Sequence, residues 1–139
     1  MKKAVIIYNS KKGTTRKYAE QIGVYLSTKG LNAQVLSIDN YSHKFIQNTD
    51  YLFLGCWTNG LMFFLQHPEK VWQDFISQLP EKLAIKTALF TTYKVLTGSM
   101  FKKMRRHLNG KIDSCTTEIK SRNGLLSEKD KETIDDFIR

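Results

Sequence analysis

The chain has 139 residues, of which 41% are hydrophobic and 12% aromatic. This length fits one domain over residues 1–139, and the apolar fraction is too high for a disordered chain. The apolar runs are far shorter than the roughly 20 residues that a membrane span needs. The 22 Lys and Arg residues outnumber the 13 Asp and Glu residues, so the formal net charge is +9 and an anionic partner is expected.

The two cysteines, Cys56 and Cys115, are too few for a disulfide framework and lack metal-ligand spacing. Cys56 ends an apolar run and is expected to be a buried, small hydrophobic residue. After the first three residues, the apolar stretch Ala4–Tyr8 is too short for a secretory signal. We therefore predict a cytoplasmic protein.

Strands and helices are predicted to alternate along the chain. Nearly continuous apolar runs predict strands buried on both faces, and apolar residues at three- and four-residue spacing predict helices. In chain order the expected elements are a strand at 4–8, a helix at 15–28, a strand at 35–38, a short helix within 39–48, a strand at 51–56, a helix at 68–79, a strand at 87–91, a helix at 97–108, a weaker strand at 115–119 and a helix at 127–138. Pro68 suits a first helical turn, Val71 falls on the apolar face of its helix, and Ser127 and Asp130 have the spacing of a helix cap. This alternation predicts a three-layer α/β domain with a parallel sheet.

The loop after the first strand is the first candidate site. Ligands of such sheets bind beyond the carboxyl ends of the strands. The loop combines hydroxyls, a glycine and two lysines and opens directly into a helix; its residues are Ser10, Lys11, Lys12, Gly13, Thr14 and Thr15. Backbone N–H groups and the helix dipole favour an anion there. A helix cap with solvated lysines is the alternative.

This loop resembles the phosphate-binding loop of the flavodoxin family, written T/S-x-T-G-x-T. Ser10, Gly13 and Thr15 match the pattern, whereas Lys12 replaces a hydroxyl with a cation. Residues 54–60 resemble the G-C-x-x-x-G loop of short-chain flavodoxins, and residues 88–93 fall where those proteins have a fourth strand ending near G-S-Y. The resemblance covers essentially the whole chain and implies a doubly wound, five-stranded sheet of order 2-1-3-4-5.

The resemblance also implies FMN as cofactor, with its phosphate on the first loop. Its ring would lie between two later loops, at Trp57, Thr58, Asn59 and Gly60 and at Thr92, Tyr93 and Lys94. Gly60 and Asn59 would tune the flavin, Trp57 is a candidate aromatic wall, and the face of Tyr93 could stack on the ring. No side chain needs to act as an acid or a base, because the cofactor carries the chemistry.

The positive charge departs from the family pattern. Flavodoxins are acidic around the flavin, whereas here the run 61–65 is apolar and Lys94 lies on the neighbouring loop. We therefore expect a less negative second reduction step than in an acidic flavodoxin. The excess charge is local, with a net +6 in residues 1–30 and +4 in residues 97–113.

The basic segment at residues 100–108 is predicted to be an amphipathic helix with a solvated basic face. It could instead dock an acidic electron-transfer partner or contact anionic lipid. No motif supports nucleic-acid binding, and no metal site is expected from His43, His67 and His107.

Three functions are compatible with these features. The first is a flavodoxin-like electron carrier between a reductase and a redox protein. The second is an FMN-dependent oxidoreductase acting on a quinone or a tetrapyrrole-type substrate, which the apolar run at 61–65 and the basic helix favour slightly. The third is a flavin-free binding or regulatory domain on the same fold. The absorbance spectrum of the protein with and without FMN separates the third from the others.

Overall fold

The computed structural model describes residues 1–58, 68–112 and 117–139. Within these ranges the strands are β1 (Lys3–Asn9), β2 (Asn32–Ser37), β3 (Tyr51–Trp57), β4 (Lys86–Thr92) and β5 (Thr117–Ser121). The α-helices are α1 (Thr14–Thr28), α2 (Lys70–Gln78), α3 (Met100–Leu108) and α4 (Glu128–Phe137). Two short 3-10 helices, η1 (Ile38–Asn40) and η2 (His43–Ile46), lie between β2 and β3.

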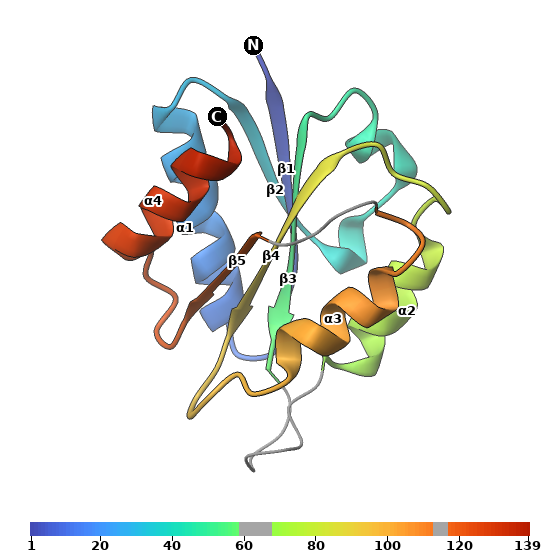
Figure 1. Ribbon diagram of the computed structural model, residues 1–139, viewed down its shortest axis with the longest axis vertical. Coiled ribbons are helices and arrows are strands. Elements are labelled where there is room, and N and C mark those ends of the chain that lie inside the picture. Colours follow the sequence, from blue (N-terminus) through green and yellow to red (C-terminus); the bar gives the residue numbers. More distant parts are fainter. Residues whose placement is uncertain (59–67, 113–116) are drawn as a thin grey trace.

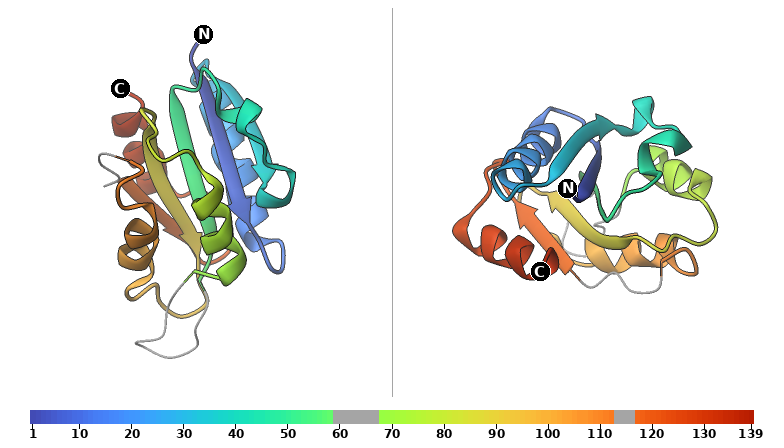
Figure 2. Two further views of the ribbon diagram at one scale, coloured as in Figure 1. Left: turned by 90° about the vertical axis from the view of Figure 1, so that its right-hand side faces the viewer. Right: turned by 90° about the horizontal axis from the view of Figure 1, so that it is seen from above.

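The strands form one parallel sheet in the order β2-β1-β3-β4-β5, which confirms the expected fold and strand order. Helices α1 and α4 cover one face and α2 and α3 the other (Figure 1). The view from above shows the sheet between these two helical layers (Figure 2). Because every strand runs the same way, all carboxyl ends meet at one edge of the sheet, here called the carboxyl edge.

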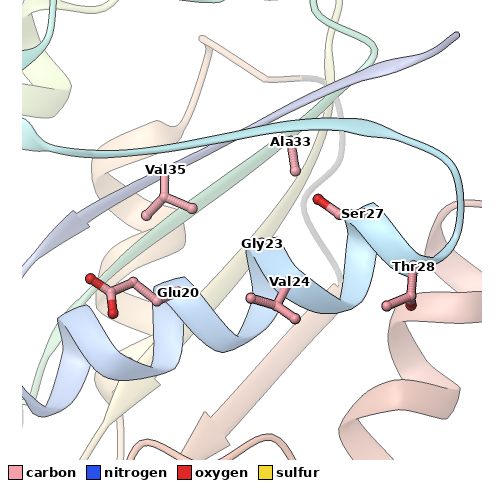
Figure 3. Close-up of a pocket in the computed structure, with 7 residues that line it drawn as sticks. All are labelled: Glu20, Gly23, Val24, Ser27, Thr28, Ala33 and Val35. Carbon is pink, nitrogen blue, oxygen red and sulfur yellow. The ribbon is translucent and has the colours of Figure 1, made fainter.

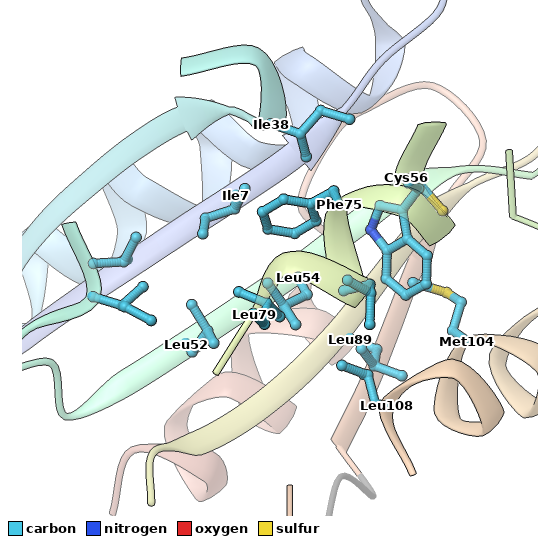
Figure 4. Packing of buried hydrophobic residues seen from close by; sticks show 14 of the residues in the cluster. Ile7, Ile38, Leu52, Leu54, Cys56, Phe75, Leu79, Leu89, Met104 and Leu108 are labelled. Carbon is cyan, nitrogen blue, oxygen red and sulfur yellow. The ribbon is translucent and has the colours of Figure 1, made fainter. Parts of the chain in front are cut away.

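Side chains that alternate between the two faces of the central strands contribute to two hydrophobic cores, one on each side of the sheet. The even-numbered residues of β3, Leu52, Leu54 and Cys56, pack with α2 and α3 around the buried Trp72 (Figure 4). The odd-numbered residues Tyr51 and Phe53 point to the other face, toward α1 and α4. Both faces of β3 are therefore buried, as its continuous apolar run predicts.

Close packing explains the glycine in β3. A Cβ on Gly55 would lie 2.2 Å from the ring of Phe90, which is fully buried on β4. The ring of Phe90 also meets Tyr18 of α1 edge to face, with 5.9 Å between the ring centroids. Glycine at position 55 thus makes room for an aromatic contact under α1.

The Tyr18 hydroxyl of α1 donates to the buried Asp130 of α4 at 2.8 Å. Burial, reinforced by the charge of Asp130, raises the pKa of Tyr18 and keeps the phenol protonated. Asp130 also forms the predicted cap, because Ser127 accepts from its backbone N–H and its carboxylate accepts from the N–H of Ser127. One carboxylate therefore both starts α4 and joins it to α1.

Several predicted boundaries were wrong. Helix α2 begins at Lys70 rather than Pro68, because Glu69 is its extended N-cap residue, and Val71 is 49% exposed instead of packing inward. Strand β2 begins at Asn32 rather than Val35, because it pairs with β1 from Lys3 onward. It is an edge strand, and its first residues are too exposed to form an apolar run. The single short helix expected within 39–48 is two 3-10 turns.

The weak fifth strand exists, but it ends at Ser121 instead of Ile119 because Thr92 of β4 pairs with Ser121. Residues 115 and 116, where it was expected to begin, lie outside the described residues. In the described part of the chain, no helix has the length and apolar character to cross a membrane.

Candidate functional site

The carboxyl edge gathers the ends of four neighbouring strands. Strands β1, β3, β4 and β5 end at Asn9, Trp57, Thr92 and Ser121. In the register of the sheet, Trp57 of β3 pairs with Thr92 of β4, and Thr92 pairs with Ser121 of β5. Each α-helix follows a strand and returns across the sheet, so the helix N-termini also lie at this edge (Figure 1). The first loop and the loop after β4, both predicted as site segments, are therefore neighbours at this edge.

The first loop is a tight turn that opens helix α1. Gly13 is the N-cap residue in a left-handed conformation, with φ of 93°, which a side chain would strain. Its N–H donates to the Ser10 hydroxyl at 3.0 Å. No side chain in the described part of the chain caps α1, and its first turn holds no acidic residue. The loop therefore leaves a positive helix end, the Ser10 hydroxyl proton and the exposed Lys11 and Lys12 for an anion.

Two pairs of threonine hydroxyls fasten the loops to β4. The buried Thr15 hydroxyl lies 2.6 Å from the hydroxyl of Thr92, 77 residues away. Thr91 donates to the carbonyl of Cys56 at 2.6 Å, so the Thr58 hydroxyl, 2.9 Å from that of Thr91, is the donor in the second pair. The Thr58 N–H also donates to the Thr92 carbonyl at 2.8 Å. Hydrogen bonds to β4 thus bring Thr15, Thr58 and Thr92 together.

Trp57 lies against the first loop. The Lys11 ammonium is 4.8 Å from the centre of the Trp57 ring. Strand alternation directs this half-buried residue to the same face as Phe53, the face covered by α1. None of the described residues accepts a hydrogen bond from its buried Nε1. Within the described residues, Trp57 therefore has an N–H donor without an acceptor beside a cationic loop.

Tyr93 follows β4 and is flanked by cations from β5. Its backbone N–H donates to the Ser121 carbonyl at 3.2 Å. Lys120 and Arg122 each lie 5.7 Å from the centre of its half-buried ring. The next residue, Lys94, is exposed. Charge around this predicted ring-binding residue is thus more positive than Lys94 alone implies.

The structure adds residues that the sequence analysis missed. Lys120 and Arg122 escaped notice because β5 was expected to end too early; a strand ending at Ser121 would have put both at the carboxyl edge. Gly124, with φ of +81°, packs so closely that a Cβ would lie 2.8 Å from the Thr14 carbonyl oxygen. The loop after β5 therefore borders the first loop. Thr14 itself is half-buried, whereas the predicted Asn59 and Gly60 lie outside the described residues.

The described residues hold no group of His, Cys, Asp and Glu that could bind a metal. Cys56 is buried as predicted, and burial raises the pKa of its thiol, which removes the reactive thiolate. These side chains offer no metal or thiolate chemistry of their own.

An open groove of about 550 Å³ lies between α1 and the edge strand β2 (Figure 3). Its lining combines the small or apolar Gly23, Val24, Ala33 and Val35 with the polar Glu20, Ser27 and Thr28. None of the predicted site residues lines it. The candidate site is therefore the carboxyl edge and not this groove.

Comparison with known proteins identifies the family and supports the fold. The family model described as flavodoxin matches residues 6–137. Among solved structures, the two-electron reduced flavodoxin of Megasphaera elsdenii has a TM-score of 0.73 at 20% identity, covering 94% of each chain. Flavodoxin 1 of Bacillus cereus has a TM-score of 0.69 at 18% identity, covering 98% of this chain and 95% of that one. A flavodoxin from the domain Archaea has a TM-score of 0.69 at 17% identity, covering 97% and 92%.

No curated protein sequence gives a significant match. The family model nevertheless spans nearly the whole chain, and the strand order agrees with it. The chain belongs to the flavodoxin family.

Proposed function

We propose that this chain binds FMN at its carboxyl edge and carries electrons between a reductase and a redox partner. The observation that carries the proposal is the first loop, an uncapped helix N-terminus with a left-handed glycine and two exposed lysines, one of which lies over the Trp57 ring. Beside it is the Trp57 indole N–H, from which no described residue accepts a hydrogen bond. Members of the flavodoxin family bind FMN and transfer electrons. When bound, FMN supplies the redox chemistry. The cytoplasmic location stays a prediction from the sequence.

The first loop suits the phosphate. The Ser10 hydroxyl accepts from Gly13 and keeps its own proton to donate to a phosphate oxygen. In the Thr15–Thr92 pair, one hydroxyl donates to the other, so the acceptor of the pair still has a proton for a ligand. The helix end and the side chains of Lys11 and Lys12 supply positive charge, and Thr14 opens the helix.

The loops after β3 and β4 suit the ring. Tyr93 offers an aromatic face beside Thr92 and Lys94, with Thr58 fixed opposite by its bonds to β4. Asn59 and Gly60 complete this proposed site. No described side chain is needed as a general acid or base, because the chain binds and orients the group that reacts.

For Trp57 we propose a role at the phosphate rather than as a wall for the ring. Its ring already contacts Lys11 of the first loop, and a buried N–H without an acceptor costs roughly 1–3 kcal/mol. A phosphate oxygen in the loop would accept this bond once Lys11 turns from the ring toward the phosphate. The indole N–H would then favour FMN over riboflavin, which lacks the phosphate.

The test is a titration of FMN and of riboflavin with the purified protein, followed by quenching of flavin fluorescence. We expect both flavins to bind, FMN more tightly. In Trp57→Phe, FMN affinity falls about tenfold, the size of one bond to a charged acceptor, while riboflavin affinity is unchanged. Absence of any quenching would contradict FMN binding itself.

Trp72→Phe is the matched control. Trp72 is fully buried between the sheet and α2, and its Nε1 also has no acceptor among the described residues. Its substitution removes the same chemical group from the opposite face of the sheet. FMN and riboflavin affinities should both stay at the values of the unmodified protein, after correction for any unfolded fraction.

A further inference from the structure

The carboxyl edge carries a ring of exposed cations, which we call the cationic rim: Lys11, Lys12, Lys94, Lys102, Lys120 and Arg122. They come from four different segments, namely the loops after β1 and β4, the first turn of α3 and the end of β5. Three members of the rim lie over described residues proposed to bind FMN, Lys11 over Trp57 and Lys120 and Arg122 over Tyr93. The rim is assembled by the fold, since no single segment contributes more than two of its members.

Helix dipoles add to this charge instead of cancelling it. The positive N-termini of the helices lie at the same edge, and the first turns of α1 and α3 contain no acidic residue. Lys102 and Lys103 occupy the first turn of α3, where a cation is unfavourable by up to about 1 kcal/mol. An edge that concentrates positive charge in this way attracts a negatively charged ligand or partner.

Three carboxylates at the carboxyl edge are engaged inside the protein, whereas Glu128 in the first turn of α4 is exposed and pairs with Lys131. Glu69 accepts from the Asn9 amide at 3.1 Å, and Glu118 pairs with Arg105. Asp130 accepts from Tyr18 and from its own cap. Among the described residues, none of these acids forms an ion pair with a rim cation.

Two rim cations are placed where an electron-transfer partner must approach. Lys120 and Arg122 lie over Tyr93, and Arg122 also donates to the Val95 carbonyl at 3.3 Å, which fixes it beside the loop after β4. Electron transfer needs the two redox groups to come close, so charges bordering the flavin also border the partner. Such charges chiefly set the association rate and the choice of partner.

We propose that the cationic rim docks an acidic redox protein, one whose own redox centre is bordered by Asp and Glu residues. This inference rests on the proposed function, since it assumes FMN at the site. It commits to a protein because two of the cations lie over Tyr93 of the proposed ring-binding site, where a redox centre has to be presented. Duplex nucleic acid and anionic membrane become outcomes of the test.

The probe is an acidic [2Fe–2S] ferredoxin, reduced and mixed by stopped flow with the FMN-loaded protein. One electron leaves the cluster, which is oxidised, and reduces the flavin. We expect the second-order rate to fall about tenfold between low and physiological salt, as for attraction between opposite charges. Electron transfer from the reduced flavoprotein to the basic protein cytochrome c should instead speed up with salt. A ferredoxin rate that is undetectable, constant or rising with salt would overturn the proposal.

Charge reversal identifies the surface. Lys120→Glu with Arg122→Glu should slow the ferredoxin reaction about tenfold or more at low salt and reverse its salt dependence. The neutral pair Lys120→Gln with Arg122→Gln should lie between these extremes. The control is Lys44→Glu with Lys82→Glu, the same charge change at two exposed residues preceding β3 and β4, at the opposite edge. Equal effects of the two reversals would overturn the assignment to the rim.

FMN affinity is measured by fluorescence for every variant before the kinetics. Failure to bind FMN contradicts the proposed function, whereas normal FMN binding without a ferredoxin preference contradicts the docking surface alone. Duplex DNA and vesicles containing phosphatidylserine are titrated in parallel. Tighter binding to either than to ferredoxin, lost in the Lys120/Arg122 reversal, would overturn the assignment of a protein partner.

Discussion

Lysines at the amino edge of the sheet donate to backbone carbonyls, and Lys2 and Lys86 at this edge also lie over aromatic rings. At the carboxyl edge, Lys11 and Lys120 lie over rings and donate to no carbonyl of the described residues. The Lys3 ammonium donates to the carbonyls of Phe45 and Gln47 at 2.9 and 3.1 Å. Lys111 donates to the Leu79 carbonyl at 2.8 Å, and Lys86 donates to that of Phe137. At the other edge, Lys11 lies over Trp57, and Lys120 and Arg122 lie over Tyr93.

The direction of the helices explains this difference. Helices α2 and α4 end at the amino edge, where Lys111 and Lys86 reach carbonyls at those ends, the negative pole of each helix. Lys3 reaches carbonyls at the end of η2. At the carboxyl edge the same charge meets positive helix ends. A lysine at the amino edge therefore stabilises the fold, whereas a lysine at the carboxyl edge destabilises it slightly. Cations at the carboxyl edge are thus best explained by a ligand.

The largest expected effect comes from the first loop. Lys11→Met with Lys12→Met should weaken FMN binding about tenfold, because two charges near the phosphate are lost. The free energy of unfolding of the ligand-free protein should stay the same or rise slightly, since cations near a helix N-terminus are removed. Flavin fluorescence and urea unfolding measure the two quantities. Clear destabilisation without FMN would break the contrast between the edges.

The converse change is Lys3→Met at the amino edge. We expect the free energy of unfolding to fall by about 1 kcal/mol, because two carbonyls lose a charged donor while the methionine keeps the aliphatic stem. FMN affinity should not change. Urea unfolding beside an FMN titration provides the measurement, and an FMN affinity reduced as much as in the first-loop variant would contradict the comparison.

Lys94 tests the electrostatic effect of the carboxyl edge on the flavin. A cation about 8 Å from the reduced ring, at an effective dielectric constant near 40, stabilises its negative charge by on the order of 1 kcal/mol. Lys94→Gln should therefore lower the potential of the second reduction step by roughly 40–50 mV. Potentiometric titration of the FMN-loaded protein checks this, with Lys82→Gln as the control. An unchanged or higher potential in Lys94→Gln would refute it.

The smallest effect is expected where charge at the amino edge is already balanced. Tyr25 donates to Asp135 at 2.6 Å, and Lys29 lies 3.4 Å from the same oxygen. The hydrogen bond from Tyr25, helped by Lys29, lowers the pKa of Asp135. Because the pKa is lower in the folded protein, this stabilisation is present above the ordinary Asp range and disappears as the pH falls through the lowered pKa.

Tyr25→Phe should move the pKa of Asp135 back up toward its ordinary value. NMR titration of the carboxyl carbon measures this shift. The small stability difference between the variant and the unmodified protein should shrink as the pH falls below about 4. A pKa of Asp135 that does not rise in the variant would show that Lys29 suffices at this edge.

Much of the fold could be predicted from the sequence, because strands buried on both faces leave continuous apolar runs. The runs at Ala4–Tyr8 and Tyr51–Cys56 are confirmed within one residue at each end. The edge strand β2 was only partly found, because its exposed residues follow no apolar run. Lys120 and Arg122 were missed for a related reason. Strand β5 has few buried apolar residues, and it ends at Ser121 because that residue pairs with Thr92 of β4.

The sequence by itself determined the alternation of strands and helices, the two-sided burial of the sheet and the position of the first loop before a helix. These features are local, since periodicity and glycine conformation act within a few residues. The tertiary structure decided which side chains meet: Thr15 with Thr92, Lys11 with Trp57, and two β5 cations with Tyr93. Such contacts depend on strand register and packing between distant segments, which a local pattern does not specify.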